Sequence, residues 1–202
     1  MCNLYRMTAS VDEMKKLFGS FEGERSNVAA QDEIYPKYAA PVMTREEGAL
    51  ALREMEWGFP GPKAAGGRPV TNVRNLSSPF WRSALANPER RCLVPVTRFS
   101  EWSAKPDPAT GRKVKHWFGL KERGEGERDA LFAFAGIWRP GEERPYFSFL
   151  TCAPNAMVGA VHPKAMPVML DPDDYDQWLG GSTEEACALA KAYPDDKMTQ
   201  FA

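Results

Sequence analysis

The sequence predicts an α+β fold, built on a mostly antiparallel sheet with helices at its edges, in a single domain over residues 1–202. The length of 202 residues, 43% of them hydrophobic, suits one domain with its own core. Many short apolar runs have the length of strands. They do not alternate regularly with helical patterns, as parallel strands joined by helices would require. No internal repeat or low-complexity linker divides the chain.

The first part of the chain begins with a helix signal and continues with a strand and a loop. Ser10 and Glu13 have the spacing of a capping box, which predicts a short helix ending at Phe18. Leu50 and Leu52 lie two residues apart, as do Met55 and Trp57, but the step from one pair to the other is three residues. This shift in the apolar alternation predicts a bulged strand over residues 50–57. The segment PGPKAAGGRP, residues 60–69, predicts a flexible loop because glycine and proline dominate it.

A second helix and a series of strands follow. Ser78 and Pro79 supply a cap and a first-turn proline for a helix over FWRSALA, residues 80–86. PDPATGRK (106–113) and RGEGERD (123–129) are typical of hairpin connections. The predicted strands are the apolar runs CLVPV (92–96), HWFGL (116–120), LFAFAGIW (131–138), YFSFLTC (146–152) and PVML (167–170).

Two helices are expected after the last of these strands. Asp171 and Pro172 predict the start of one helix, which should end before Gly180. Ser182 and Glu185 have the capping-box spacing for the other. The strands therefore occupy the middle of the chain and the helices its edges, as the α+β prediction requires.

Cysteine, histidine and hydropathy patterns exclude several classes of protein. No stretch approaches the roughly 20 apolar residues that span a bilayer, and the first residues lack the apolar core of a signal peptide. The 4 cysteines show no CxxC spacing, which favours free thiols in a reducing compartment, and the 2 histidines count against a His-rich metal site. Cys92 and Cys152 lie in apolar runs and should be buried. We therefore expect a cytoplasmic monomer without membrane contact, metal or cofactor.

The net charge of −1 conceals a basic central stretch. Residues 61–117 contain 11 Lys or Arg against 3 Asp or Glu. Positive charge beside aromatic rings suits single-stranded nucleic acid, whose phosphates are bound and whose bases stack. A solvated charged face around core aromatics would give the same composition, so charge alone leaves both interpretations open. The aromatic residues of this stretch are Phe80, Trp81, Phe99, Trp102 and Trp117.

Cys2 stands out because it directly follows the initiator methionine. Cysteine is small enough to permit removal of Met1, and we expect this processing. It would leave an α-amine and a thiol on adjacent carbons, a pair whose chemistry an internal cysteine lacks. With reference pKa values of about 7.7–8.0 for the amine and about 8.5 for the thiol, both groups should be partly nucleophilic near neutral pH.

Three further segments carry side chains suited to chemistry, namely TNVRN (71–75), RFSEW (98–102) and VHPKAMP (161–167). Singly, each of their polar residues has an ordinary explanation in a turn, a loop or the surface. Together they add an amide, a cation, a carboxylate and an imidazole to the nucleophile. These residues are Asn72, Arg74, Glu101 and His162.

In these motifs the sequence resembles the SOS-response-associated peptidase family, whose members covalently trap abasic sites in single-stranded DNA. The resemblance is specific because the motifs follow one another in order along most of the chain, with cysteine at position 2. They are MCNLY (1–5), WGF (57–59), TNVR (71–74), RCLVPVTRFSEW (91–102), FAGIW (134–138), FLTCAPN (149–155) and HPKAMPVML (162–170).

The resemblance implies a β-barrel-like core with a channel for single-stranded DNA, a thiazolidine crosslink at the amino-terminal cysteine, an associated autopeptidase activity, and association with the nucleoid when DNA is damaged. Asn3 and Leu4 replace the family's usual Gly-Arg, so one basic contact near the nucleophile is missing. The family's catalytic residues fall on Cys2, Asn72, Glu101 and His162, its phosphate-contacting arginine on Arg74, and its channel-lining residues on Pro41, Trp57, Trp102 and Thr151.

Two other functions remain open at this point. In an N-terminal-nucleophile amidohydrolase, the amine of Cys2 would activate its own thiol against a small amide or peptide. That reaction needs an oxyanion hole, and a basic, tryptophan-bearing middle is not expected for it. In a noncatalytic single-strand binding module, Cys2 would be incidental and its replacement would leave DNA association intact.

Overall fold

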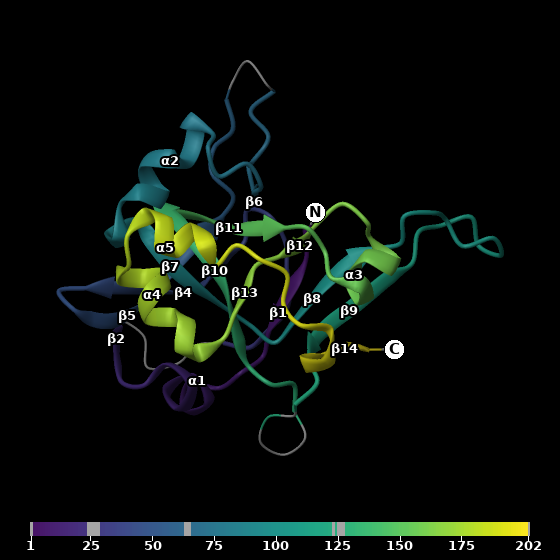
Figure 1. Ribbon diagram of the computed structural model, residues 1–202, viewed down its shortest axis with the longest axis horizontal. Helices are drawn as coiled ribbons and strands as arrows, with labels where there is room; N and C mark the ends of the chain where they lie inside the picture. Colours follow the sequence, from purple (N-terminus) through teal and green to yellow (C-terminus); the bar gives the residue numbers. More distant parts are fainter. Residues whose placement is uncertain (1, 24–28, 63–65, 123, 125–127, 202) are drawn as a thin grey trace.

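Two sheets and a set of short helices form the computed structural model, which describes residues 2–23, 29–62, 66–122, 124 and 128–201 (Figure 1). The α+β prediction is confirmed. The strands are β1 (Tyr5–Met7), β2 (Phe21–Gly23), β3 (Gln31–Ile34), β4 (Ala39–Glu46), β5 (Ala49–Trp57), β6 (Asn72–Val73), β7 (Arg91–Val96), β8 (Arg98–Trp102), β9 (Lys115–Leu120), β10 (Phe132–Arg139), β11 (Tyr146–Cys152), β12 (Met166–Pro167), β13 (Met169–Leu170) and β14 (Met198–Phe201). The α-helices are α1 (Val11–Phe18), α2 (Pro79–Ala86), α3 (Ala156–Val161), α4 (Tyr175–Gly180) and α5 (Thr183–Ala188), and the 3₁₀ turns are η2 (Pro88–Arg90), η4 (Pro172–Asp174) and η5 (Asp195–Lys197).

The larger sheet curls into a near-closed ring of strands. From β11 through β10, β7 and β4 to β5, each strand pairs antiparallel with the next. β5 and β11 then pair in parallel, Glu56 with Tyr146 and Trp57 with Phe147, so the sheet returns to its first strand. The barrel-like core implied by the family resemblance is therefore confirmed.

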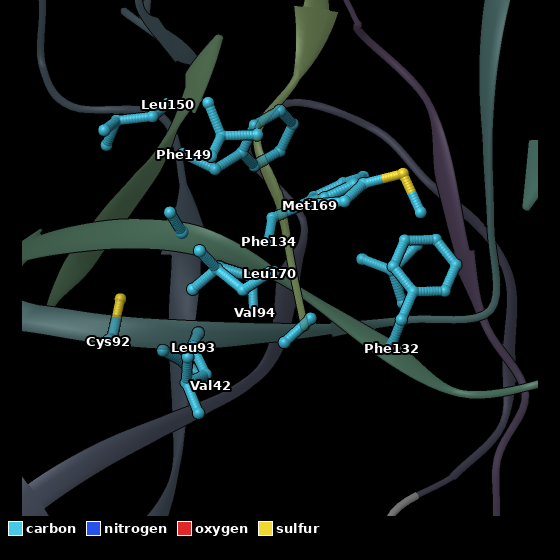
Figure 2. Close-up of a cluster of buried hydrophobic side chains, with 14 of the residues drawn as sticks. Val42, Cys92, Leu93, Val94, Phe132, Phe134, Phe149, Leu150, Met169 and Leu170 are labelled. Carbon is cyan, nitrogen blue, oxygen red and sulfur yellow. The ribbon is translucent and has the colours of Figure 1, made fainter. Parts of the chain in front are cut away.

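The interior of the ring is filled by apolar side chains from facing strands. Figure 2 shows Val42, Leu93, Phe134 and Phe149 converging, with the ring centroids of Phe134 and Phe149 4.8 Å apart. Every residue of β7 is buried, which explains why its sequence after Arg91 is a continuous apolar run instead of an alternating one. Cys92 packs among these side chains as a free thiol, as predicted.

The smaller sheet has the strand order β14-β9-β8-β1-β3 and carries the start of the chain. Tyr5 of β1 pairs antiparallel with Phe99 of β8. The backbone N–H of Ser100 also donates to the carbonyl of Leu4 at 3.0 Å. This pairing places the residues before β1 beside the carboxyl end of β8.

Helix starts follow the capping signals of the sequence. Ser10 with Glu13 closes a capping box on α1, and Ser182 with Glu185 does the same on α5. The side chain of Ser78 caps α2. The helices lie around the ring and not inside it (Figure 1). Among the described residues, no helix combines the length and the apolar character needed to cross a membrane.

The bulge predicted over residues 50–57 is wrong. β5 pairs with β4 in one unbroken register, from Ala39 opposite Glu56 to Glu46 opposite Ala49. The phase change in the sequence arises because Ala51 and Leu52, which point to opposite faces of the strand, are both buried. The alternation of apolar and polar residues in β5 therefore breaks because both faces of the strand are covered, and not because a residue is inserted.

The segment 123–129 is not the connection of a hairpin. β9 before it pairs with β8 and β14, whereas β10 after it pairs with strands of the ring, so the chain passes from one sheet to the other. Turn-forming residues signal a reversal of the chain but do not select which strands pair. The other predicted hairpin, over 106–113, does join the antiparallel pair β8 and β9. Residues 63–65 of the loop predicted over 60–69 lie outside the described part of the chain. Residues 123 and 125–127 of the connection between β9 and β10 also lie outside it.

Candidate active site

Cys2 lies where the two sheets meet, just before β1. Its side chain has no exposed surface, and its Sγ donates to the carbonyl oxygen of Leu4 at 3.4 Å. Burial raises the pKa of the Cys2 thiol, and the charge of Glu101 raises it further. The thiol is therefore protonated at neutral pH, and the reference pKa of a free cysteine does not apply to it.

The carboxamide of Asn72 links Cys2 to the ring. β6 places it there by pairing in parallel with β11, Asn72 opposite Phe149. Its Nδ2 donates to the carbonyl oxygen of Cys2 at 2.9 Å and to Oγ1 of Thr71 at 2.7 Å. Its Oδ1 is buried and has no hydrogen-bond partner among the described residues. Since buried acceptors are normally satisfied, this oxygen is suited to accept from a bound group.

Glu101 and His162 form the second half of the site. Glu101, near the end of β8, is 2% exposed. His162 follows α3, and its Nδ1 lies 3.6 Å from Oε2 of Glu101 and 3.1 Å from the carbonyl oxygen of Ala165. Because a carbonyl can only accept, Nδ1 carries the proton in this arrangement and Nε2 is the acceptor of the ring.

Desolvation shifts the pKa values of the two groups in opposite directions. Burial raises the pKa of the Glu101 carboxyl to about 7. Burial also lowers the pKa of the His162 imidazole, although its contact with the Ala165 carbonyl opposes this. At neutral pH the carboxyl therefore exists in both forms and the imidazole is mainly neutral. Such a pair is suited to general acid and base catalysis.

We expect the free energy of unfolding to depend on pH through Glu101. Its folded pKa, about 7, lies above the ordinary value of 4.5, so the folded state holds the proton more tightly. The resulting stabilisation is complete below pH 4.5 and is lost as pH rises through about 7. Relative to Glu101→Gln, the wild type should lose on the order of 3 kcal/mol between pH 4.5 and 8. Urea unfolding of both proteins across this range measures it, and parallel curves would contradict it.

Arg74 and Trp102 are the DNA-contact candidates that the structure leaves accessible. Arg74 is exposed directly after β6. Trp102 is 39% exposed and follows Glu101 at the end of β8. Arg74 also lies close enough to Cys152 for its charge to oppose the rise that burial causes in the thiol pKa. Arg74 follows Asn72 by two residues and Trp102 directly follows Glu101, so each is next to a member of the cluster along the chain.

The other three channel-lining candidates are buried in the structure. Trp57 is fully buried, and its Nε1 donates to the carbonyl oxygen of Thr71 at 3.1 Å. Pro41 is buried in β4. Thr151 is 2% exposed, and its hydroxyl lacks a hydrogen-bond partner within the described residues. Trp57 thus supports the segment that carries Asn72 from inside the core.

The basic central stretch divides between core and surface. Phe99 stacks on Phe118 in the core, their ring centroids 5.5 Å apart. Arg98 forms an ion pair with Asp129 and lies over the ring of Phe201. Some of the aromatic and basic residues of this stretch therefore have a structural role, as expected for a charged face around core aromatics. Trp102 is one of those that remain exposed.

Sequence reasoning missed Thr71 and Ala165. Thr71 accepts from Asn72 through its hydroxyl and from Trp57 through its carbonyl. The carbonyl of Ala165 sets the tautomer of His162. Small residues and backbone groups carry no chemical signal of their own, and only their proximity to Asn72 and His162 in sequence could have indicated them.

Cys2, buried where the two sheets meet and close to an amide, a carboxyl and an imidazole, defines a class of α+β proteins with a candidate cysteine nucleophile. The family model described as SOS response associated peptidase (SRAP) matches residues 1–202. The chain belongs to this family.

Solved structures share the fold at low sequence identity. A protein from Bacteroides thetaiotaomicron superposes with a TM-score of 0.80 at 21% identity, covering 99% of this chain and 91% of that one. A protein from Bordetella bronchiseptica gives 0.77 at 20%, covering 98% of each chain. A phage-related protein from Bordetella bronchiseptica gives 0.74 at 20%, covering 99% and 93%. No curated protein matches the sequence.

Proposed function

We propose that the protein captures abasic sites in single-stranded DNA by a covalent bond to Cys2, after removal of Met1. The observation that carries this proposal is the hydrogen bond from Asn72 Nδ2 to the Cys2 carbonyl at 2.9 Å, because it fixes the first residue of the processed chain beside Glu101 and His162.

The reaction joins the 1,2-aminothiol to the aldehyde of the ring-opened sugar. The α-amine of Cys2 adds to the aldehyde carbon, and loss of water gives an imine. The thiol sulfur then adds to the imine carbon while the thiol proton passes to nitrogen, which closes a five-membered thiazolidine. No oxidant or cofactor is consumed. Closure is intramolecular, and well-oriented reactions of this kind reach effective molarities of about 10⁵–10⁸ M.

The protonation states of the site suit this order of events. The buried thiol is protonated, so the amine, with a reference pKa of about 7.7–8.0, attacks first. Glu101, with a pKa of about 7, accepts a proton from the amine and returns one when water leaves. The neutral His162 imidazole transfers a proton during opening of the sugar ring. Glu101 also serves the removal of residues that precede Cys2.

The DNA contacts in this proposal are sequence-tolerant. Arg74 binds a phosphate, and Trp102 stacks on a base that flanks the lesion, an interaction worth about 1–3 kcal/mol. An abasic site has no base that the protein could recognise, so specificity for the lesion comes from the aldehyde. We further propose that the protein acts in the cytoplasm as a monomer and joins the nucleoid when DNA is damaged.

Incubation with a single-stranded oligonucleotide that contains one abasic site tests the proposal. The expected result is a denaturation-resistant adduct whose intact mass equals the sum of the processed protein and the DNA minus one water. Retained Met1 together with an adduct would contradict it. Turnover of a small amide without an adduct would favour the amidohydrolase, although the protonated thiol of Cys2 counts against attack on an amide.

Arg74→Ala should weaken binding of single-stranded DNA and make it less sensitive to salt. Loss of one phosphate contact is expected to reduce the slope of log K against log salt by about 0.7. Fluorescence anisotropy over a salt series measures this slope. Arg144→Ala is the matched control, because Arg144 is exposed and pairs with Glu54 where β11 begins, at the opposite end from Thr151. An unaltered slope for Arg74→Ala would exclude the phosphate contact.

His162→Ala should slow crosslinking without weakening DNA binding. Loss of a general acid or base typically reduces rates by about 10²–10⁴-fold. Single-turnover adduct formation on denaturing gels gives the rate, and anisotropy gives the affinity. His116→Ala is the comparison variant, because His116 pairs directly opposite Glu101 in the ladder of β8 and β9 while its ring contacts Gln200 at 3.0 Å, so a smaller loss of rate than in His162→Ala would assign the proton transfer to His162. Equal losses of rate and affinity would reassign His162 to DNA contact.

A further inference from the structure

A hairpin over residues 103–114 joins β8 to β9 and projects from the body of the protein on the side of α3 (Figure 1). Residues 104–114 are all exposed except Asp107, which is half-buried. None of their side chains belongs to the hydrophobic core. Core packing therefore does not account for this hairpin, and its surface is open to a partner.

Hydrogen bonds within the hairpin hold it in one shape. At its base, the backbone N–H of Ser103 donates to the carbonyl of Val114 at 2.8 Å, and the N–H of Val114 donates to the hydroxyl of Ser103 at 3.0 Å. Near the tip, the N–H of Asp107 donates to the carbonyl of Arg112 at 2.8 Å, and the Asp107 carboxylate accepts from two backbone N–H groups of the turn. A preorganised surface of this kind loses less conformational entropy on binding than a flexible loop does.

The hairpin presents positive charge to the solvent. Its charged residues are Lys105, Arg112 and Lys113 against Asp107. The carboxylate of Asp107 is occupied by the turn, whereas none of the three cations forms an ion pair with a carboxylate of the described residues. This local excess stands out in a chain whose net charge is −1. An anionic partner therefore fits the hairpin better than a neutral or cationic one.

The hairpin adjoins the Cys2 site through its contact with the end of α3. The backbone N–H of Ala104 donates to the carbonyl of Val161 at 3.0 Å, which holds the base of the hairpin beside the residue before His162. Burial is the main cause of the lowered pKa of His162, and the charges of Lys164 and Lys113 lower it further. Both ammonium groups thus lie near the imidazole, on the side from which the hairpin projects.

We propose that this hairpin binds the phosphates of one arm of the single-stranded DNA that flanks the abasic site. Lys105, Arg112 and Lys113 contact the phosphates. Trp102 and Val114, which are 39% and 40% exposed, offer apolar surface to a base where the hairpin begins and ends. Because the hairpin lies on one side of the site, it contacts the arm on one side of the lesion and leaves the other free. This inference rests on the proposed binding of DNA at the Cys2 site and extends the bound length beyond the lesion.

Fluorescence anisotropy with oligonucleotides of different arm lengths tests the inference on the full-length protein. Each oligonucleotide carries a tetrahydrofuran residue, an abasic analogue without an aldehyde, so that binding is measured without crosslinking. Starting from about two nucleotides on each side, one arm at a time is extended to about ten. Extension of one arm should raise the affinity of the wild type by at least about tenfold, and extension of the other should not.

The triple variant Lys105→Gln, Arg112→Gln, Lys113→Gln should lose this gain. With the long arm, the slope of log K against log salt should fall by about 2, because each phosphate contact on a single strand contributes about 0.7. With the shortest oligonucleotide, the variant should bind as the wild type does. The three residues are exposed, so their replacement leaves the core intact.

The matched control removes three exposed lysines that lie away from the hairpin. It carries Lys15→Gln and Lys16→Gln on α1 and Lys191→Gln shortly after α5, two helices distant from the hairpin in Figure 1. This control changes the net charge by the same amount and should keep the full gain from the longer arm.

Three results would overturn the inference: no gain from extending either arm, the same gain in the triple variant as in the wild type, or equal losses on short and long oligonucleotides, which would indicate general attraction only. The proposed function is reported separately by a short oligonucleotide that bears the aldehyde. If the wild type formed no adduct with it but kept the gain from one arm, covalent capture at Cys2 would fail while the hairpin contact stood.

Discussion

Cys2→Ala is expected to abolish the stable adduct with abasic DNA while leaving DNA affinity close to that of the wild type. The variant keeps its α-amine after Met1 removal and can still form an imine, but no sulfur is present to close the ring. Imines hydrolyse, so adducts that survive denaturation should fall by at least about 10³-fold, given the effective molarity of intramolecular closure. Denaturing gels and intact mass measure the loss.

Chemical trapping separates this outcome from a folding defect. Borohydride reduces an imine to a stable amine, so Cys2→Ala treated with borohydride should regain a crosslink at the amino terminus. Cys187→Ala is the thiol control, because Cys187 lies on α5 and is partly exposed. Heat-stable adducts on Cys2→Ala without borohydride would locate the attachment at another side chain and remove the thiazolidine from the mechanism.

Glu101→Gln should slow the processing of an amino-terminally extended form by about 10²–10⁴-fold, the usual contribution of a general acid or base. Glutamine has nearly the same shape but cannot accept a proton. In the wild type a base must be ionised, so the processing rate should rise as pH increases through about 7. In Glu101→Gln the residual rate should lose this rise. Intact mass spectrometry over time, at pH values from 5.5 to 8.5, follows both proteins.

The control for this experiment is Glu89→Gln, a change of an exposed carboxylate on η2. It should process at the wild-type rate at every pH. If Glu101→Gln also processed normally, the carboxylate would have no part in removing residues before Cys2. Its role in the crosslink would then need a separate measurement of adduct formation with the processed variant.

Local signals in the sequence predicted the starts of α1, α2 and α5 correctly because the interactions that cap them are local. The helix predicted from Asp171 and Pro172 instead begins with the 3₁₀ turn η4, and α4 starts only at Tyr175. Ser10 with Glu13 and Ser182 with Glu185 satisfy orphan backbone donors within four residues of chain. The same reasoning missed α3 and β14. Asn155, which caps α3, lies in FLTCAPN without a helical pattern after it. β14 forms as an edge strand of the smaller sheet, where pairing with β9 decides its conformation.

Chemical identity alone could not place the members of the candidate site. Cys2, Asn72, Glu101 and His162 were each indicated by residue type and motif. The pairings of β1 with β8 and of β6 with β11 bring Cys2, Asn72 and Glu101 together. The backbone N–H of Ala104, just after β8, donates to the carbonyl of Val161 at 3.0 Å and so holds the residue before His162 beside them. Trp57 illustrates the reverse case, since an aromatic residue in a family motif is fully buried and supports the site from behind.

The sequence by itself determined the fold class, the capped helix starts, the residue types of the candidate site and membership of the family, because each depends on neighbouring residues or on motif order. The tertiary structure alone decided which strands pair, the enclosure of the ring and the protonation states of Cys2, Glu101 and His162. Pairing joins residues far apart in the chain, and pKa values follow from desolvation. Neither burial nor long-range pairing is encoded at any single position.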